Sequence, residues 1–320
     1  MIGLVTKKNS IPMKPAVGVF DSDRPIVLDG GLSSWLGDKG YDLDSDLWSA
    51  RLILESPEAI VQAHMDFLEA GARIITTVSY QASLPGLCSY GLDSDQARRT
   101  ILDSVSLAVD ARDRFLAENP GEEVFIAASV GPYGAYLADG SEYRGNYGVS
   151  EEILVEFHRE RLELLDTSEA DFLACETIPD YLEARVLNEL LMGLTKPAWV
   201  CLSCADATTI WDGTAVTATA ELYNQNPVVR GIGINCTSPR YIGALIEKLK
   251  LACPDKSIVV YPNSGEVYDA STHTWSEGDC TGDFSPAVRE WRSRGADIIG
   301  GCCRVSPEQV NRIMQELNTS

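Results

Sequence analysis

The chain of 320 residues is 45% hydrophobic and 23% charged, which is the balance of a globular protein with a sizeable core. Its formal net charge of -21 argues against nucleic acid as a partner. No stretch approaches the roughly 18 consecutive apolar residues of a membrane helix, and no apolar signal-peptide run follows the first residues, so we expect a cytoplasmic protein.

The pattern along the chain predicts a loosely structured lead-in over residues 1–24 and a single α/β domain over residues 25–320. Short apolar and β-branched runs predict eight strands, at 26–28, 72–78, 124–130, 172–177, 198–203, 228–236, 257–261 and 296–299. Helices are predicted to follow them, beginning near residues 57, 93, 151, 179, 215, 239, 286 and 307. Several of these starts pair a capping serine with a proline in the first turn.

The strands are short and apolar without alternation, as expected where both faces of a parallel sheet are covered. Eight strand–helix units in this length predict a (β/α)8 barrel of the TIM type. A doubly wound open sheet is the main rival, but the glycine fingerprint of a dinucleotide site is absent after the first strand. We therefore expect a single-domain barrel.

Nine dispersed cysteines, without a secretion signal, favour reduced thiols over a disulfide framework. Cys302 and Cys303 follow the last strand directly after Gly300-Gly301. Neighbouring strand side chains point to opposite faces, so both thiols can reach one partner only if the strand stops or kinks. We expect the glycines to permit this through backbone angles that other residues avoid. The pair could bind a metal, form a vicinal disulfide or be buried as small apolar side chains.

The C-terminal ends of the strands are where the active site of such a barrel forms. The residues there are Asp29, Gln81, Gly131, Glu176, Cys236, Asn263, Cys302 and Cys303. The three cysteines come from the sixth and eighth strands, and three thiolates with an open fourth position are typical of a reactive zinc. Cys204, in the Cys-x-x-Cys run at 201–204, stays open as an additional ligand, although residues three apart on a strand face opposite ways.

Asp29 and Glu176 are the carboxylates at these ends. An aspartate before Gly-Gly is often only a turn former. A glutamate that ends an apolar strand needs partners, because burying an unpaired charge is costly. Two carboxylates that face one mouth could bind an ammonium group.

Eight segments together resemble the homocysteine S-methyltransferases, and most closely their S-methylmethionine-dependent branch. They are 28–32 (LDGGL), 47–50 (LWSA), 77–83 (TVSYQAS), 131–143 (GPYGAYLADGSEY), 176–179 (ETIP), 233–236 (GINC), 262–266 (PNSGE) and 300–304 (GGCCR). The resemblance implies a barrel that uses zinc to methylate the sulfur of L-homocysteine with a sulfonium donor, S-methylmethionine ahead of S-adenosylmethionine. Methionine would be the product.

The same resemblance implies roles for particular residues. Cys236, Cys302 and Cys303 would hold the zinc. The substrate-binding residues would be Asp29 and Glu176 at the homocysteine amino group, Gly30 and Gly31 at its carboxylate, and Gln81 and Asn263. Gln81 stands where the betaine-using relatives carry a tyrosine. Trp48, Tyr133, Tyr136 and Trp275 are candidates for cation–π contact with the sulfonium.

Other functions remain open at this stage. The chain could be a methyl-accepting module that works with a separate corrinoid protein. Gly300-Gly301 could cradle a phosphate, as loops after the last barrel strands often do. A non-catalytic zinc-binding or thiol-binding barrel is a further alternative. In each case the loops at 131–149 and 266–282 are expected to cover the mouth.

Overall fold

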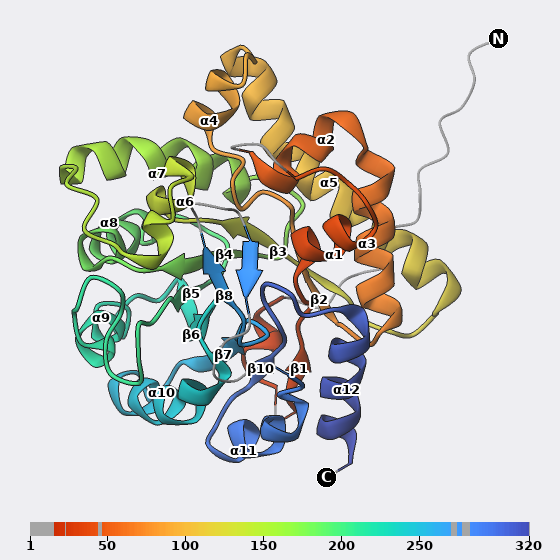
Figure 1. The fold of residues 1–320 in the computed structure, drawn as a ribbon, viewed down its shortest axis with the longest axis vertical. Coiled ribbons are helices and arrows are strands. Elements are labelled where there is room, and N and C mark those ends of the chain that lie inside the picture. The colour runs from red at the N-terminus through yellow and green to blue at the C-terminus, as the bar shows by residue number, and fades with distance from the viewer. Residues whose placement is uncertain (1–15, 23, 44–46, 270–273, 277–281, 320) are drawn as a thin grey trace.

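The computed structural model describes residues 16–22, 24–43, 47–269, 274–276 and 282–319, and Figure 1 shows helices arranged around a central set of strands. Eight parallel strands form one sheet in the order β1-β10-β7-β6-β5-β4-β3-β2. Their bounds are β1 (Ile26–Val27), β2 (Ile74–Thr76), β3 (Phe125–Val130), β4 (Phe172–Ile178), β5 (Ala198–Leu202), β6 (Val229–Asn235), β7 (Ser257–Tyr261) and β10 (Ile298–Ile299).

The two ends of this sheet meet and close the barrel. A parallel bridge joins Leu28 to Ile74, beside β1 and β2. The Asp29 amide donates to the Ile74 carbonyl at 3.0 Å, and the Arg73 amide donates to the Val27 carbonyl at 2.8 Å. The predicted (β/α)8 barrel is therefore confirmed.

The helices lie outside the barrel, and the long ones begin within two residues of their predicted starts. The bounds are α1 (Leu32–Asp38), α2 (Leu52–Glu55), α3 (Pro57–Glu69), α4 (Leu84–Ser89), α5 (Ser94–Glu118), α6 (Tyr133–Leu137), α7 (Glu151–Asp166), α8 (Tyr181–Leu191), α9 (Val216–Glu221), α10 (Pro239–Ala252), α11 (Val288–Ser293) and α12 (Pro307–Asn318). Asp93 and Gln96 form a capping box at the start of α5, and Ser306 and Gln309 form one at the start of α12. Among these helices none is long and apolar enough to cross a membrane.

The short elements were not predicted. They include α1, α2, α4 and α6, the 3-10 helices η1 (Ala16–Val19), η2 (Trp48–Arg51) and η3 (Ser141–Tyr143), and the antiparallel hairpin β8 (Val267–Asp269) with β9 (Thr274–Ser276). The helix predicted near residue 286 begins as the 3-10 helix η4 (Ser285–Ala287) and continues as α11. An element of three to seven residues makes too few turns or alternations for a periodic signal. The loop expected at 266–282 therefore carries this hairpin, and residues 270–273 and 277–281 lie outside the described chain.

The core has two parts, one between the strands and helices and one inside the barrel. Inside the barrel, Phe20 packs against Phe172 and Trp199, with ring centroids 5.4 and 6.5 Å apart. Phe20 belongs to the predicted lead-in but is buried here. These aromatic side chains fill the barrel interior. The open space therefore lies at the C-terminal ends of the strands.

Candidate metal and substrate site

A cavity of about 580 Å³ lies at the C-terminal ends of the strands. The side chains that line it and carry chemistry are Asp29, Trp48, Thr76, Tyr80, Ser129, Glu142, Tyr143, Glu176, Thr177, Asn235, Cys236, Tyr261, Cys302 and Cys303. No lysine, arginine or histidine stands among the described residues that line it. The cavity is therefore anionic in character and suited to a cation.

Three thiols converge in this cavity. The Cys236 and Cys303 sulfurs are 3.8 Å apart, the Cys302 and Cys303 sulfurs are 4.0 Å apart, and all three lie within 4.8 Å of one another. Disulfide sulfurs lie about 2.05 Å apart, so Cys302 and Cys303 are free thiols in this structure. Sulfurs bound tetrahedrally to one zinc ion at about 2.3 Å would lie about 3.8 Å apart. The described trio fits one such ion.

The three thiols also shift one another's pKa. Hydrogen bonds with the Cys302 and Cys303 thiols hold the pKa of Cys236 well below its usual range. Hydrogen bonding to Cys236 in turn raises the pKa of Cys302 and Cys303 well above their usual range. Converting all three thiols to thiolates therefore needs an added positive charge.

Close packing brings the cysteine pair to the mouth. The Gly301 amide donates to the Asp29 carbonyl at 2.9 Å, and the Cys302 amide donates to the Pro262 carbonyl at 2.7 Å. A Cβ on Gly301 would lie 2.1 Å from the Val305 side chain. The expectation that Gly300-Gly301 adopt special backbone angles is wrong, because neither has a positive φ. Glycine is needed here for close approach.

The phosphate alternative for these glycines is also contradicted. The Gly300 amide donates to the Val260 carbonyl at 3.0 Å, and the Gly301 amide is bonded to Asp29 as described above. Neither amide is available to an anion, and no cationic side chain lines the described cavity.

Backbone strain is concentrated beside the thiols. Three lining residues, Trp48, Thr177 and Cys236, have φ of 44°, 61° and 44°, and Arg304 next to Cys303 has φ of 65°. Such conformations cost about 1–3 kcal/mol each and persist only where the surroundings hold them. Asn235 holds Thr177 from both sides: its Oδ1 accepts from the Thr177 amide at 2.6 Å, and its Nδ2 donates to Thr177 Oγ1 at 2.7 Å.

Asp29 and Glu176 are both buried and both line the cavity. Asp29 accepts from the Thr76 amide at 2.7 Å and from Thr76 Oγ1 at 3.0 Å. Glu176 accepts from Ser129 Oγ and, at 2.9 Å, from the Tyr261 hydroxyl. Burial raises the pKa of Asp29, with a further contribution from the Glu176 charge, and burial raises the pKa of Glu176 to about 7. An ammonium group would offset the charge of both carboxylates.

The raised pKa of Glu176 predicts a pH-dependent stability cost. Its folded-state pKa of about 7 lies above the reference value of 4.5, so the folded chain binds more protons between these pH values and loses stability as pH rises. In metal-free protein at pH 8, we expect the free energy of unfolding of Glu176→Gln to be about 1–3 kcal/mol higher than that of the wild type. Urea unfolding at pH 8 and pH 5 measures the gap, which should narrow at pH 5. A gap of equal size at both pH values would contradict this account.

The other expected substrate residues are placed as follows. Gly30 and Gly31 line the cavity, but the Gly31 amide donates to the Val305 carbonyl at 2.9 Å. Gln81 and Asn263 are not among the lining residues. The Gln81 amide group donates to the Ala135 carbonyl at 2.8 Å, and Asn263 Oδ1 accepts from the Gly265 amide at 3.1 Å. The Gln81 and Asn263 side chains therefore stabilise loops. Tyr80, the residue before Gln81, lines the cavity.

Cys204 lies apart from the three converging thiols. It is buried in the core between strands and helices, and its amide donates to Thr237 Oγ1 at 3.0 Å. Burial raises the pKa of its thiol, which disfavours the thiolate that a metal needs. The structure does not support Cys204 as an additional ligand.

The aromatic candidates divide into lining and packing side chains. Trp48 lines the cavity, whereas Tyr133 and Tyr136 pack on Phe157 with ring centroids 5.1 and 5.5 Å away. The side chain of Trp275 lies outside the described residues. Tyr80, Glu142, Tyr143 and Asn235 line the cavity without having been singled out from the sequence. The resembling segments contain them, but no spacing rule marks them.

The loop at 131–149 carries Glu142 and Tyr143 and is anchored to α8 through Glu183. This buried carboxylate accepts from the Tyr133 amide at 2.5 Å and from the Tyr147 hydroxyl at 2.8 Å. It also bonds His158 of α7 at 2.7 Å. Because buried hydrogen-bonded networks are rigid, this one fixes the segment that brings Glu142 to the mouth.

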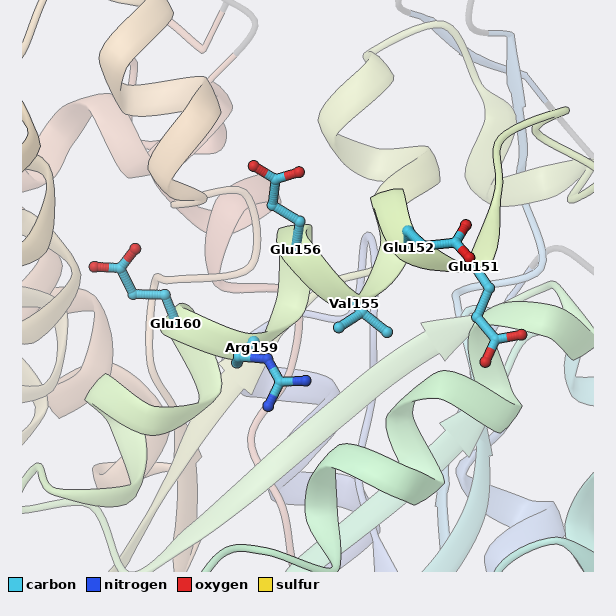
Figure 2. A pocket seen from close by; sticks show the side chains of 6 residues that line it. All are labelled: Glu151, Glu152, Val155, Glu156, Arg159 and Glu160. Atoms are coloured by element: carbon cyan, nitrogen blue, oxygen red, sulfur yellow. The ribbon is translucent and has the colours of Figure 1, made fainter.

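A second hollow, of about 490 Å³, lies on α7 in the outer helix layer. Figure 2 shows its lining residues, Glu151, Glu152, Val155, Glu156, Arg159 and Glu160, projecting from this one helix. Two of the carboxylates form ion pairs, Glu160 with Arg98 and Glu151 with Arg185. No thiol or strand end contributes to its lining, so we assign the chemistry to the cavity at the strand ends.

The chain is similar to proteins of known family and structure. A family model described as homocysteine S-methyltransferase matches residues 26–317. Homocysteine S-methyltransferase YbgG of Bacillus subtilis (strain 168) is 45% identical over 306 residues, covering 94% of this chain and 97% of that protein. The homocysteine S-methyltransferase of Escherichia coli (strain K12) is 41% identical over 299 residues, covering 92% and 96%. The crystal structure of the metallated homocysteine methyltransferase MmuM from Escherichia coli has a TM-score of 0.85 at 38% identity, covering 94% of this chain and 99% of that one.

Proposed function

Because the chain belongs to the homocysteine S-methyltransferase family, we propose that it methylates L-homocysteine to methionine with a sulfonium donor and a zinc ion. Cys236, Cys302 and Cys303 would hold the zinc. S-methylmethionine is the preferred donor in this proposal and S-adenosylmethionine the second, since the 131–143 loop resembles the S-methylmethionine-dependent branch.

The convergence of three sulfurs is the observation that carries the proposal. Their separations of 3.8 and 4.0 Å suit tetrahedral zinc, and three thiolates leave a fourth position for a substrate sulfur. When bound, zinc would lower the pKa of the substrate thiol, which is ordinarily about 8.5, and so supply a thiolate at neutral pH. The metallated form of the Escherichia coli relative gives further support for a metal.

Asp29 and Glu176 would bind the ammonium group of homocysteine. Both are buried carboxylates in an anionic cavity, and hydrogen bonds from Thr76, Ser129 and Tyr261 orient them. A carboxylate can accept about four hydrogen bonds, so each retains capacity for the substrate. Holding the amino group at one end of homocysteine would orient its sulfur toward the three thiols.

The methyl transfer needs positioning more than acid–base catalysis. The homocysteine thiolate sulfur forms a bond to the methyl carbon of the donor as the bond from that carbon to the sulfonium sulfur breaks. The bonding electron pair stays on the leaving sulfur, which becomes a neutral thioether and takes no proton. The cavity would therefore act by aligning two sulfurs about one carbon in the absence of bulk water.

In the decisive experiment, purified and zinc-loaded protein is incubated with homocysteine and with each methyl donor separately. S-methylmethionine with one deuterated methyl group is used as the donor. We expect two methionines per turnover, and mass spectrometry of the methionine measures the transfer of a methyl group to homocysteine. Absence of methionine with every sulfonium donor would contradict the proposal. Turnover that appears only when a methylated corrinoid protein is added would favour the methyl-accepting module instead.

A further inference from the structure

The Glu142 carboxylate has no assigned role in the reaction described above. We propose that it binds the positive charge of the sulfonium donor and thereby selects charged methyl donors over neutral ones. This inference rests on the proposed function and deepens it, because it concerns the donor side of the same cavity.

Glu142 is a buried side chain that lines the cavity, with only 4% of its surface exposed. Its Oε2 has no hydrogen-bond partner among the described residues, unlike the oxygens of Asp29 and Glu176. A buried carboxylate oxygen without a hydrogen bond costs free energy, and the positive charge of a bound ligand can offset that cost. Glu142 therefore differs from the two carboxylates that the protein itself already satisfies.

Close packing holds the backbone at Glu142, where the side chain enters the cavity. A Cβ on Gly134 of α6 would lie 2.6 Å from the Glu142 amide nitrogen, which shows how tightly the two segments pack. The Tyr143 amide donates to the Gly140 carbonyl at 3.0 Å and closes the turn. The position of the Glu142 backbone is thus set before any ligand binds.

No side chain of the described cavity supplies a counter-charge to Glu142. The nearby Arg144 pairs with Asp139 at 3.0 Å and is 60% exposed, so it offsets the charge of Glu142 only weakly. Burial, with smaller contributions from the charges of Cys236 and Asp139, raises the pKa of Glu142 to about 7. The carboxylate form is therefore costly in the empty cavity, and an incoming cation would stabilise it.

Position distinguishes Glu142 from the carboxylates expected at the homocysteine amino group. Asp29 and Glu176 lie at the ends of β1 and β4, whereas Glu142 belongs to η3 in the loop beyond β3. Glu142 also lies close enough to Cys236 and Cys303 to interact with both electrostatically. A donor that approaches the thiols past this loop would bring its sulfonium near Glu142.

The attraction applies to the reactant and not to the leaving group. The donor sulfur is positive before transfer and neutral afterwards, so its interaction with Glu142 falls as the thioether forms. Glu142 would therefore favour binding of the charged donor and release of the neutral product. A neutral methyl donor would gain nothing from this side chain.

Glu142→Gln tests the inference, because it removes the charge and keeps the shape. We expect the KM for S-methylmethionine to rise by about 10- to 100-fold, with zinc content and the KM for homocysteine unchanged. The rate with iodomethane, a neutral donor, should stay within about twofold. Binding of trimethylsulfonium to the zinc-loaded protein, measured by calorimetry, should weaken in parallel. Glu142→Asp, which keeps the charge, should raise the KM for S-methylmethionine less than Glu142→Gln does.

Glu156→Gln is the matched control, because Glu156 is an exposed carboxylate on the outer face of α7 (Figure 2). An unchanged KM for S-methylmethionine in Glu142→Gln would overturn the inference. Equal losses with iodomethane and S-methylmethionine would also overturn it, since they would indicate a structural role. If the wild-type protein gives no methionine with any sulfonium donor, the proposed function itself fails, which is a different result.

Discussion

Cys302→Ala is expected to lose its zinc and to reduce methionine formation by about 10³-fold or more. At pH 7 a thiol of pKa about 8.5 is only about 3% ionised, so loss of the metal costs about 30-fold through ionisation alone. Loss of the fixed position of the substrate sulfur accounts for the remainder. Metal content by mass spectrometry and single-turnover rates with S-methylmethionine measure the two effects together.

Cys88→Ala is the control for this variant, because Cys88 is an exposed free thiol outside the converging trio. Cys204→Ala serves as a buried control, since Cys204 is also outside the trio. Both controls should keep about one zinc per chain and near wild-type rates, apart from the stability cost of truncating a buried thiol. A Cys302→Ala protein that retains full zinc would remove the metal assignment.

Asp29→Asn is expected to raise the KM for homocysteine by about 10- to 100-fold with zinc content unchanged. Hydrogen bonds to charged groups contribute about 1.5–3 kcal/mol, and the amide cannot offer the negative charge that an ammonium group needs. Asp29 is 1% exposed, so water cannot easily replace the lost interaction. Initial rates at saturating donor measure the change.

A substrate analogue separates binding from structural damage in this variant. 4-Sulfanylbutanoate, which is homocysteine without its amino group, should react about equally with wild type and Asp29→Asn. Asp103→Asn, at an exposed position on α5, should behave as wild type with both substrates. Equal losses with homocysteine and the analogue would mean that Asp29 supports the strand end and does not bind the amino group.

The barrel was predictable because its strands are buried on both faces. The runs at 172–177 and 257–261 are apolar without alternation, and they become β4 and β7. A capping serine followed by proline predicted helix starts, as at Ser306. The short elements at the mouth were missed because they contain too few residues for either signal.

The convergence of the thiols was predictable from topology alone. Cys236 and the pair at 302–303 follow strands six and eight, and parallel strands in a closed barrel direct their C-terminal ends to one mouth. The reason for Gly300-Gly301 was not predictable from local rules. Close approach to Leu28, Asp29 and Val305 needs these glycines, and those contacts exist only in the folded chain.

The order of the elements, the closed parallel barrel and the convergence of the three thiols follow from the amino-acid sequence, because burial and capping signals lie within a few neighbouring residues. Which other side chains enter the cavity depends on how the loops pack in the folded chain. Beyond a strand end the backbone no longer alternates regularly, so Tyr80 faces the cavity while Gln81 bonds to Ala135. Glu142 reaches the site for the same kind of reason, since a loop anchored at Glu183 folds it inward from a stretch without periodicity.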